Sequence, residues 1–211
     1  MYIYCISGFG ADHRIFKYLD FGNNEVIHIP WIQPLSEESI AGYASRLAKA
    51  IRQPDPLLIG VSFGGMMSIE ISKIISVKKV ILISSIKTRN EMPISFKIAA
   101  NLRLNKIIPL KPYKFLEPFE NYNLGISNKE EKDLAEDFRK NLNQKYSDWS
   151  IQTIINWQNK YIPGQTIHIH GSKDRIFPLK YVSPDYVIEG GGHMMIMDKA
   201  AEINKILKSE I

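Results

Sequence analysis

Short apolar runs alternate with amphipathic stretches over residues 1–84, and again after about residue 165. Apolar runs bounded by Pro, Gly or polar clusters predict buried strands, whereas apolar residues three and four positions apart predict helices. The expected strands cover residues 2–6, 25–29, 57–61, 80–84, 165–170 and 186–188. The expected helices cover about 12–19, 36–51, 66–75 and 200–207. Buried strands alternating with helices predict an α/β fold with a doubly wound, mostly parallel sheet of about six strands.

The strand pattern stops between about residues 86 and 161. Helical spacing indicates helices around residues 95–104, 129–142 and 150–158, and prolines interrupt the chain between the first two. This segment is too apolar to be disordered and too long to be a bare loop. We therefore expect a single domain over residues 1–211 that carries a helical cap insertion at about 88–160.

Composition and charge exclude several classes of protein. Of the 211 residues, 45% are hydrophobic and 23% are charged, as in ordinary globular proteins, and no apolar run is long enough to span a membrane. The net charge of +5 comes from scattered lysines, so no nucleic-acid partner is expected. The single cysteine, Cys5, lies within an apolar run and is expected to be a buried thiol. With no leader-like pattern at the N-terminus, this predicts a cytoplasmic protein.

The sequence Gly60-Val61-Ser62-Phe63-Gly64 joins an expected strand directly to an expected helix. A strand that turns abruptly into a helix passes very close to itself, so Gly60 and Gly64 are interpreted as the small residues that permit the approach. Ser62 would then be held in a strained conformation with its hydroxyl exposed beyond the sheet. Alone, Gly-x-Ser-x-Gly is a weak motif.

A serine nucleophile needs a base, and the base needs a carboxylate that orients it. His193 follows the last expected strand and the glycines at 190–192, which allow the loop to reach over the sheet. Asp174 is the only carboxylate in the loop 171–178, after the preceding strand. Since ligands of such sheets bind beyond the carboxyl ends of the strands, Ser62, Asp174 and His193 are the candidate catalytic residues.

The other histidines have simpler interpretations. His28, His168 and His170 lie within expected strands and are expected at packed or edge positions. His170 is also close to a strand end, so a place at the border of the site is the alternative for it, and His13 is expected near the rim of the pocket. Glu91 is the only plausible substitute for Asp174. His168 and His170 share one strand face, but no nearby cysteine or paired carboxylates complete a ligand set, so no metal is expected. No nucleotide cofactor is expected either, because Gly8-Phe9-Gly10 lacks the third glycine of the dinucleotide fingerprint.

Acyl transfer also requires donors for the negative oxygen that develops on the carbonyl. The backbone N–H of Phe63, directly after Ser62, is one candidate. The second is the N–H of Phe9, in the glycine-containing loop after the first strand.

Taken together, four motifs resemble those of the α/β-hydrolase superfamily, in the same order: residues 8–10, 60–65, 171–178 and 190–193. The resemblance implies a nucleophile at Ser62, an acid at Asp174 and a base at His193, with Phe9 and Phe63 forming the oxyanion hole. It also implies a small single-domain hydrolase similar to carboxylesterases, without the N-terminal hairpin that the fold usually has. Ser7 stands where many members have histidine.

The expected function is hydrolysis of a small ester or thioester through an acyl-enzyme, with a small-molecule acyl substrate. One alternative uses the same three residues for C–C bond hydrolysis or elimination, and another is a non-catalytic binding protein with this fold. The sequence gives no indication of oligomeric state. The expected pocket residues are Met66, Phe96, Phe115, Phe119, Trp149 and Met194.

Overall fold

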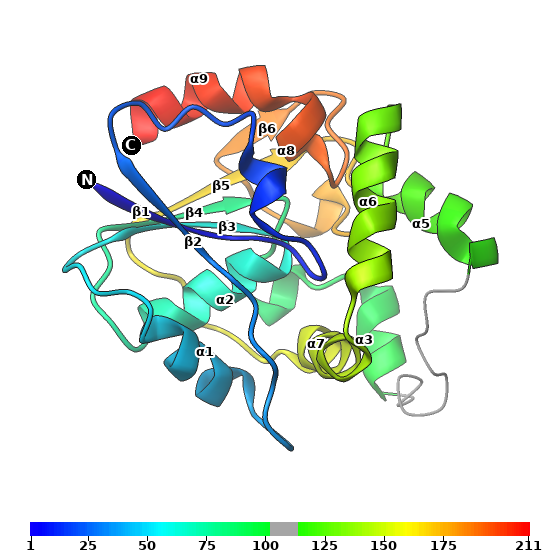
Figure 1. Cartoon of the computed structure of the whole chain (residues 1–211), viewed down its shortest axis with the longest axis horizontal. Coiled ribbons are helices and arrows are strands. Elements are labelled where there is room, and N and C mark those ends of the chain that lie inside the picture. The colour runs from blue at the N-terminus through cyan, green and yellow to red at the C-terminus, as the bar shows by residue number, and fades with distance from the viewer. Residues whose placement is uncertain (102–113) are drawn as a thin grey trace.

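The computed structural model in Figure 1 describes residues 1–101 and 114–211. One parallel sheet contains β1 (Tyr2–Ile6), β2 (Glu25–Ile29), β3 (Leu57–Val61), β4 (Lys79–Ile83), β5 (Thr166–Gly171) and β6 (Tyr186–Ile188). Their order across the sheet is β2-β1-β3-β4-β5-β6. The chain moves outward from β1 to β2 and then returns to β3, so a crevice is expected beyond the ends of β1 and β3.

All six strands fall within one residue of their expected positions, and the predicted parallel α/β sheet is confirmed. Ile6 pairs with Gly60, and Val61 pairs with Ile83, so the ends of the three central strands are level. Side chains that follow these strands therefore emerge at the same edge of the sheet.

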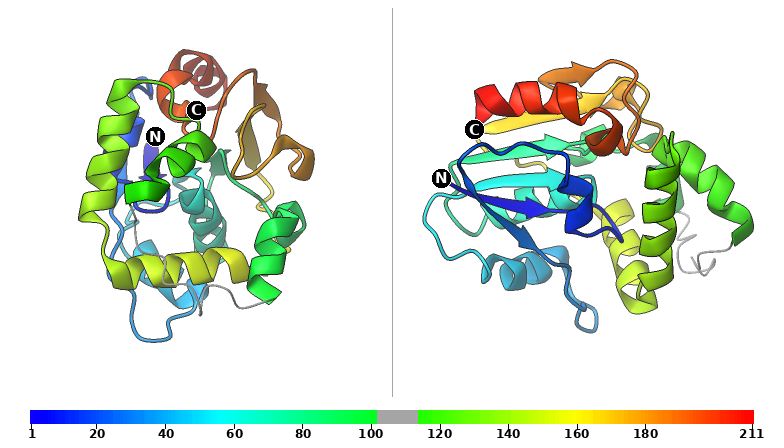
Figure 2. Two further views of the ribbon diagram at one scale, coloured as in Figure 1. Left: turned by 90° about the vertical axis from the view of Figure 1, so that its right-hand side faces the viewer. Right: turned by 45° about the horizontal axis from the view of Figure 1, so that its top comes forward.

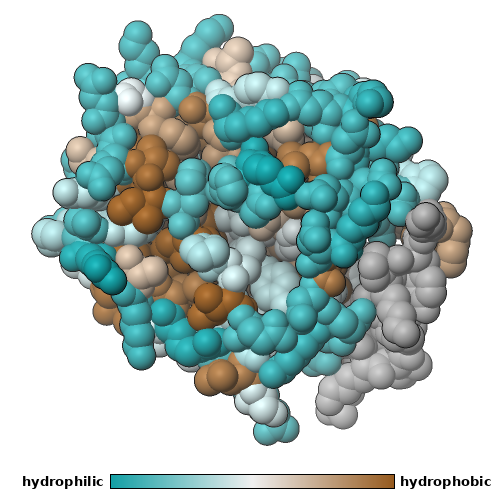
Figure 3. All heavy atoms as spheres, in the orientation of Figure 1, coloured by the Kyte–Doolittle hydropathy of each residue, from teal (hydrophilic) through white to brown (hydrophobic). Residues whose placement is uncertain are grey.

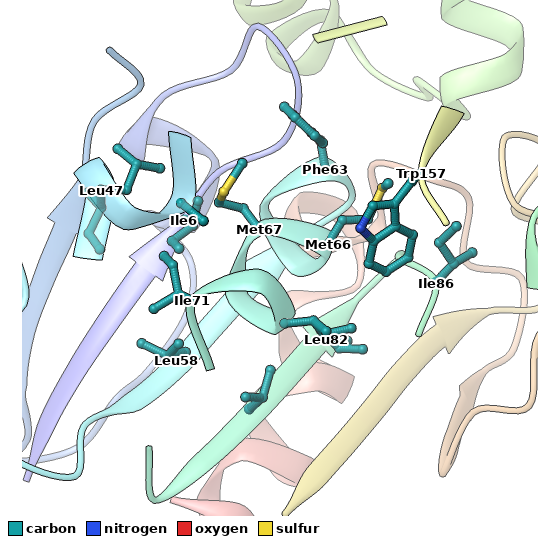
Figure 4. Packing of buried hydrophobic residues seen from close by; sticks show 14 of the residues in the cluster. Ile6, Leu47, Leu58, Phe63, Met66, Met67, Ile71, Leu82, Ile86 and Trp157 are labelled. Carbon is teal, nitrogen blue, oxygen red and sulfur yellow. The ribbon is translucent and has the colours of Figure 1, made fainter. Parts of the chain in front are cut away.

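Helices cover both faces of the sheet. On one face, Leu58 and Leu82 pack with residues of α1 (Ile40–Ala48) and α2 (Phe63–Ser72). Figure 4 shows Met66, Met67 and Ile71 of α2 lying over these strand residues. On the other face, strand residues such as Ile59 and Ile81 pack with η1 (His13–Phe16), α8 (Met195–Asp198) and α9 (Ala200–Glu210). The central strands are buried on both sides, which explains why their sequences are continuous apolar runs.

A third group of helices lies beyond the carboxyl ends of the strands, at the right of Figure 1 and facing the viewer in the left view of Figure 2. It comprises α3 (Ile94–Asn101), α5 (Glu117–Leu124), α6 (Lys129–Asn141) and α7 (Gln144–Asn156). Short 3-10 turns lie at Arg89–Glu91, Lys114–Leu116 and Leu179–Tyr181. The expected helix over 95–104 is observed for its described part, and 102–104 lie outside the described residues. Helix α5 was not expected, and α7 begins six residues earlier than expected.

Two further expected helices have other boundaries in the structure. The helix expected from Ser36 begins at Ile40, because Glu37 has φ of 52°, which a right-handed helix does not accommodate. The hydroxyl of Ser39 instead accepts a hydrogen bond from Gly42 N at 3.1 Å and caps the helix. The helix expected over 12–19 is a single 3-10 turn, which Asp12 caps as expected.

Polar residues dominate the surface seen in Figure 3, with apolar residues visible between them. Cys5 is buried as expected, with 1% of its surface exposed, and burial raises the pKa of its thiol. Among the described residues, no helix has both the length and the apolar character that crossing a membrane requires.

Candidate active site

Ser62 lies at the junction of β3 and α2 with φ of 53° and ψ of −119°, a combination that residues with a side chain rarely adopt. Hydrogen bonds to Ile83 and Ser85 hold it there. Its N–H donates to the carbonyl oxygen of Ile83 at 2.9 Å, and its carbonyl oxygen accepts from Ser85 Oγ at 2.7 Å. The backbone is therefore fixed on both sides of this strained residue.

The two glycines that flank this turn are required by packing. A Cβ at Gly60 would lie 2.4 Å from the carbonyl oxygen of Gly64, and a Cβ at Gly64 would lie 2.2 Å from that of Ile6. Both neighbours are backbone atoms, which cannot rotate away as a side chain could. The first turn of α2 thus packs against the ends of β1 and β3, and its close approach to β3 is the one that the sequence predicted.

The structure brings Ser62, His193 and Asp174 into one chain of hydrogen-bonding distances. Ser62 Oγ lies 2.9 Å from His193 Nε2, and His193 Nδ1 lies 2.8 Å from Asp174 Oδ2. Asp174 and His193 are 4% and 5% exposed, respectively, whereas Ser62 is partly exposed. A carboxylate accepts hydrogen bonds only, so His193 Nδ1 carries the proton and Nε2 can accept one from Ser62.

The environment of Asp174 favours its ionised form. Burial alone would raise the pKa of Asp174, but the charge and hydrogen bond of His193, with smaller contributions from His170 and the backbone, hold the pKa below its usual value. The backbone N–H groups of Ile176 and Phe177 both donate to Oδ1 at 2.8 Å. Oδ2 is thereby left to face His193.

The loops after β5 and β6 are tied to each other. Lys173 N donates to the carbonyl oxygen of Gly191 at 2.9 Å, and Gly190 N donates to Ser172 Oγ at 2.8 Å. The loop that carries His193 is also attached to α5, because Met194 N donates to the carbonyl oxygen of Leu124 at 2.9 Å. The helical insertion therefore contacts the loop of the candidate base directly through the backbone.

The loop after β1 packs against Ser62. A Cβ at Gly8 would lie 3.4 Å from Ser62 Cβ. Ser7 Oγ donates to the carbonyl oxygen of Ala11 at 2.7 Å, and Trp31 Nε1 donates to that of Gly8 at 3.0 Å. The N–H of Phe63 is in the first turn of α2, where amides have no acceptor within their own helix. The structure thus places the candidate donors Phe9 and Phe63 on segments that adjoin Ser62.

The remaining titratable candidates lie elsewhere. His13 is exposed, and its ring contacts that of His28, 5.6 Å away, outside the cavities described below. Glu91 is buried, and its carboxylate accepts from the backbone of Lys87 at 2.6 Å and of Ser183 at 3.3 Å. It does not contact His193, so the structure gives no support to Glu91 as the substitute acid.

Two adjoining cavities lie beside Ser62. The inner cavity, of about 390 Å³, is lined by Ser62 and His193 and by apolar residues from the strand ends, α3, α5 and α7. The outer cavity, of about 810 Å³, shares several of those apolar residues and reaches Arg139, Arg175 and Lys180. Among the described residues, Ser62 and His193 are the polar side chains that line the inner cavity.

Three expected pocket residues line these cavities. Phe96 and Met194 line both, and Phe119 lines the outer one. The other three do not. Met66 is fully buried beneath the site, where Figure 4 shows it beside Trp157. Phe115 is 77% exposed and lines neither cavity.

Trp149 is the third expected pocket residue that lies elsewhere. Its ring stacks on Tyr43, 4.2 Å away, and its Nε1 donates to the carbonyl oxygen of Glu38 at 2.7 Å. Residues two apart on a helix point to nearly opposite sides, so Ile151 faces the cavities while Trp149 packs toward α1. Helical spacing was the signal that could have found Ile151, Ile154 and Ile155 as the lining residues.

No group of acidic, histidine or cysteine side chains in the described part of the chain could hold a metal ion. Sequence reasoning missed three anchoring side chains: Ser7, Trp31 and Ser85. Each donates a hydrogen bond to a backbone carbonyl oxygen, across a turn or from a distant part of the chain. No local sequence motif predicts such a contact.

No protein-family model matches the sequence, and comparison with curated proteins gives no significant match. Solved structures do match over nearly the whole chain. An esterase from Exiguobacterium antarcticum has a TM-score of 0.72 and 14% sequence identity, covering 99% of this chain and 91% of that one. A lipase-esterase related protein from Clostridium acetobutylicum ATCC 824 has a TM-score of 0.70 and 16% identity, covering 100% and 94%.

A bromoperoxidase from Bacillus anthracis has a TM-score of 0.71 and 18% identity, covering 99% of this chain and 90% of that one. Similarity at this level of identity concerns the fold. Together with the parallel six-stranded sheet, it confirms the expected fold: the chain has the α/β-hydrolase fold.

Proposed function

We propose that this protein is a serine hydrolase that cleaves an ester or thioester through an acyl-enzyme intermediate. The observation that carries the proposal is the continuous path from Ser62 Oγ to His193 at 2.9 Å and on to Asp174 at 2.8 Å. Nucleophile, base and orienting carboxylate within hydrogen-bond reach are the arrangement that activates a serine hydroxyl. The site opens on an apolar cavity, where a carbonyl substrate would be partly shielded from water.

In the acylation step, Ser62 Oγ attacks the substrate carbonyl while its proton passes to His193 Nε2. The imidazolium that forms is stabilised by Asp174, which stays ionised. The N–H groups of Phe63 and Phe9 are proposed to hold the negative oxygen of the tetrahedral intermediate. His193 then gives its proton to the leaving oxygen or sulfur as the bond to the carbonyl carbon breaks.

Deacylation repeats the same steps with water. His193 Nε2 takes a proton from water, and the resulting hydroxide attacks the acyl carbon of the ester on Ser62. Collapse of the second tetrahedral intermediate returns the proton to Ser62 Oγ and releases the carboxylic acid. No group beyond the chain's own residues and water is needed to balance the reaction.

The inner cavity suggests the chemistry of the acyl group. A negatively or positively charged acyl chain would lose its hydration there without gaining a partner, because the described lining is apolar apart from Ser62 and His193. An uncharged, apolar acyl chain would instead be stabilised by about 25 cal/mol for each Å² of apolar surface that it buries. We therefore propose an uncharged acyl group as the part of the substrate next to Ser62.

The helices α3, α5, α6 and α7 are proposed to act as the cap over this site. Residues of α3, α5 and α7 line the inner cavity, and the backbone of α5 is bonded to the His193 loop. The names of the structural neighbours, esterase and lipase-esterase related protein, agree with the proposed reaction class.

A series of p-nitrophenyl esters with increasing acyl length tests the reaction and the pocket together. We expect turnover of the short and medium acyl esters by the unmodified protein, and no turnover above background by S62A. S62A should keep the native circular dichroism spectrum, because the change removes one oxygen atom from a partly exposed side chain.

A fluorophosphonate probe separates the alternatives. Labelling of Ser62 without turnover of any ester would favour C–C bond hydrolysis or elimination by the same residues. Neither labelling nor turnover by well-folded protein would favour a binding protein. Full ester turnover by S62A would exclude Ser62 as the nucleophile.

A further inference from the structure

Behind Asp174 lie two histidines that the proposed mechanism does not use. His168 and His170 lie on one face of β5, and both side chains are fully buried. Their rings meet at nearly a right angle with centroids 5.0 Å apart, and His168 Nε2 lies 3.1 Å from His170 Nδ1. On its other side, His170 Nε2 lies 2.7 Å from the carbonyl oxygen of Phe177.

These partners determine where the protons are. A carbonyl oxygen only accepts hydrogen bonds, so His170 Nε2 must carry the proton that it donates to Phe177. A neutral His170 then has an unprotonated Nδ1, which can only accept. The proton between the two rings therefore belongs to His168 Nε2. Both imidazoles have the same tautomer, with the proton on Nε2.

The hydrogen bond of His170 ends on the turn that holds the candidate acid. Phe177 receives the His170 proton on its carbonyl oxygen, and its own N–H donates to Asp174 Oδ1 at 2.8 Å. His170 Nε2 also lies 3.5 Å from Asp174 Oδ2, the oxygen that faces His193. One N–H group thus anchors the turn and presents its positive end to the carboxylate.

We propose that His170 is a positioning residue, which holds the 174–177 turn so that Asp174 faces His193, and that His168 fixes the tautomer in which His170 can do so. The proposal rests on the proposed function for its effect on the reaction. Without the proton from His168, His170 could place its own proton on Nδ1, and its bare Nε2 would face the Phe177 carbonyl. Two acceptors in contact would release the turn.

Burial is the main reason that both rings of the pair are neutral. Burial lowers the pKa of His170 against the opposing effect of Asp174. Burial lowers the pKa of His168 further, with His170 and Lys87 adding to the shift and the backbone of Ser85 opposing it. His193 also faces His170 and disfavours a second positive charge. The Asp185 carboxylate accepts the backbone N–H of His168 at 2.8 Å. The environment therefore supports the neutral tautomers that the hydrogen bonds require.

Glutamine and leucine replacements distinguish positioning from packing. The side-chain amide of glutamine can place a donor near the position of Nε2, whereas leucine fills the space without a donor. We expect H170L and H168L to lower kcat by about 10-fold to 100-fold with little change in KM, the range seen when outer partners of metal-bound histidines are removed. H170Q and H168Q should recover most of the loss. H28Q, on the edge strand β2, is the matched control and should keep full activity.

Nuclear magnetic resonance of the unmodified protein, with 15N-labelled histidine rings, tests the same proposal without any substrate. We expect His168 and His170 to appear as neutral rings protonated on Nε2. The hydrogen-bonded Nδ1 proton of His193 should be protected from exchange, and it should broaden or vanish in H170L but persist in H170Q.

An Nδ1-protonated His170, or equal activity and equal His193 signals in H170L and H170Q, would overturn the proposal. If no ester is turned over by any variant, the proposed function fails, while the ring signals still decide whether His170 positions Asp174. If H170L does not fold, H168L and the ring tautomers remain as tests.

Discussion

The N–H of Ser62 donates to the carbonyl oxygen of Ile83 at 2.9 Å while Ser62 itself has φ of 53°. The neighbouring strand thus holds the serine in a conformation that costs about 1–3 kcal/mol for a residue with a side chain. The strain is confined to Ser62, so it predicts a difference in stability between the variants S62G and S62A.

Replacing Ser62 by glycine should give a more stable protein than replacing it by alanine. Alanine keeps the strained Cβ, whereas glycine removes it, and the greater freedom of glycine in the unfolded chain offsets part of the gain. We expect S62G to exceed S62A by about 1 kcal/mol in the free energy of unfolding, measured in urea. Equal stability of the two variants would mean that Ser62 is not strained.

Gly64 should tolerate no larger side chain. The Cβ of G64A would lie 2.2 Å from the carbonyl oxygen of Ile6, so α2 must move away from β1. We expect a loss of about 1–3 kcal/mol in unfolding free energy, as is typical of overpacked sites, and a fall in activity. Gly164 is the control, because a Cβ added there would meet no atom within 4 Å, and G164A should be neutral. A neutral G64A would contradict the close contact between α2 and β1.

The strand pattern and the candidate residues were readable in the sequence because they depend on local periodicity and on chain order. Buried parallel strands are short apolar runs, and residues just after them share one edge of the sheet. This is how Asp174 and His193 could be paired with Ser62 from the sequence alone. The orientation of a helix about its own axis was harder to read, so Trp149 was expected in the pocket although it packs on Tyr43.

Long-range anchors could not be predicted in the same way. The partner of His170 is a backbone carbonyl at Phe177, and the partner of Trp31 is the carbonyl of Gly8. Any buried donor can satisfy any nearby carbonyl, so the sequence carries no pattern for such a pair. Met66 was misplaced for a related reason, since an apolar residue next to the turn suits the buried core as well as the pocket.

Stability should fall as the pH is lowered from about 7 to about 5. The pKa values of His168 and His170 lie below the ordinary value of about 6.5 in the folded protein, so the unfolded chain binds more protons in this range. The contribution of the two neutral rings to stability is therefore fully present above the pKa of histidine in the unfolded chain. It is lost as the pH falls toward the lower pKa values of the folded protein. Urea unfolding at several pH values should show this slope.

The double variant H168Q/H170Q provides the control for the pH effect, because it removes the rings of His168 and His170 and leaves His28, whose pKa burial also lowers. Its stability should change less between about pH 7 and about pH 5 than that of the unmodified protein. If the double variant and the unmodified protein show the same change of stability with pH, groups other than His168 and His170 cause that change. Asp174, whose pKa is lowered, adds its own loss only at pH values below about 4.

A bulky residue in place of Ile151 should limit the site to shorter acyl chains. Ile151 lines both cavities, so the indole of I151W would fill space at their junction. We expect kcat/KM for longer p-nitrophenyl esters to fall by about 10-fold or more relative to the acetate ester, a difference of about 1.4 kcal/mol in transition-state binding. I98W, at a half-exposed position that lines neither cavity, is the control. If kcat/KM depends on acyl length in I151W as it does in the unmodified protein, the acyl chain does not bind in the cavities that Ile151 lines.

The acyl-enzyme itself gives the most direct test of the proposed chemistry. The protein is mixed with a p-nitrophenyl ester, quenched in acid during turnover, and digested for mass spectrometry. We predict one added acyl group, located on the peptide that contains Ser62, and no such adduct in S62A. Hydrolysis without an adduct on Ser62, or an adduct that persists in S62A, would contradict the account.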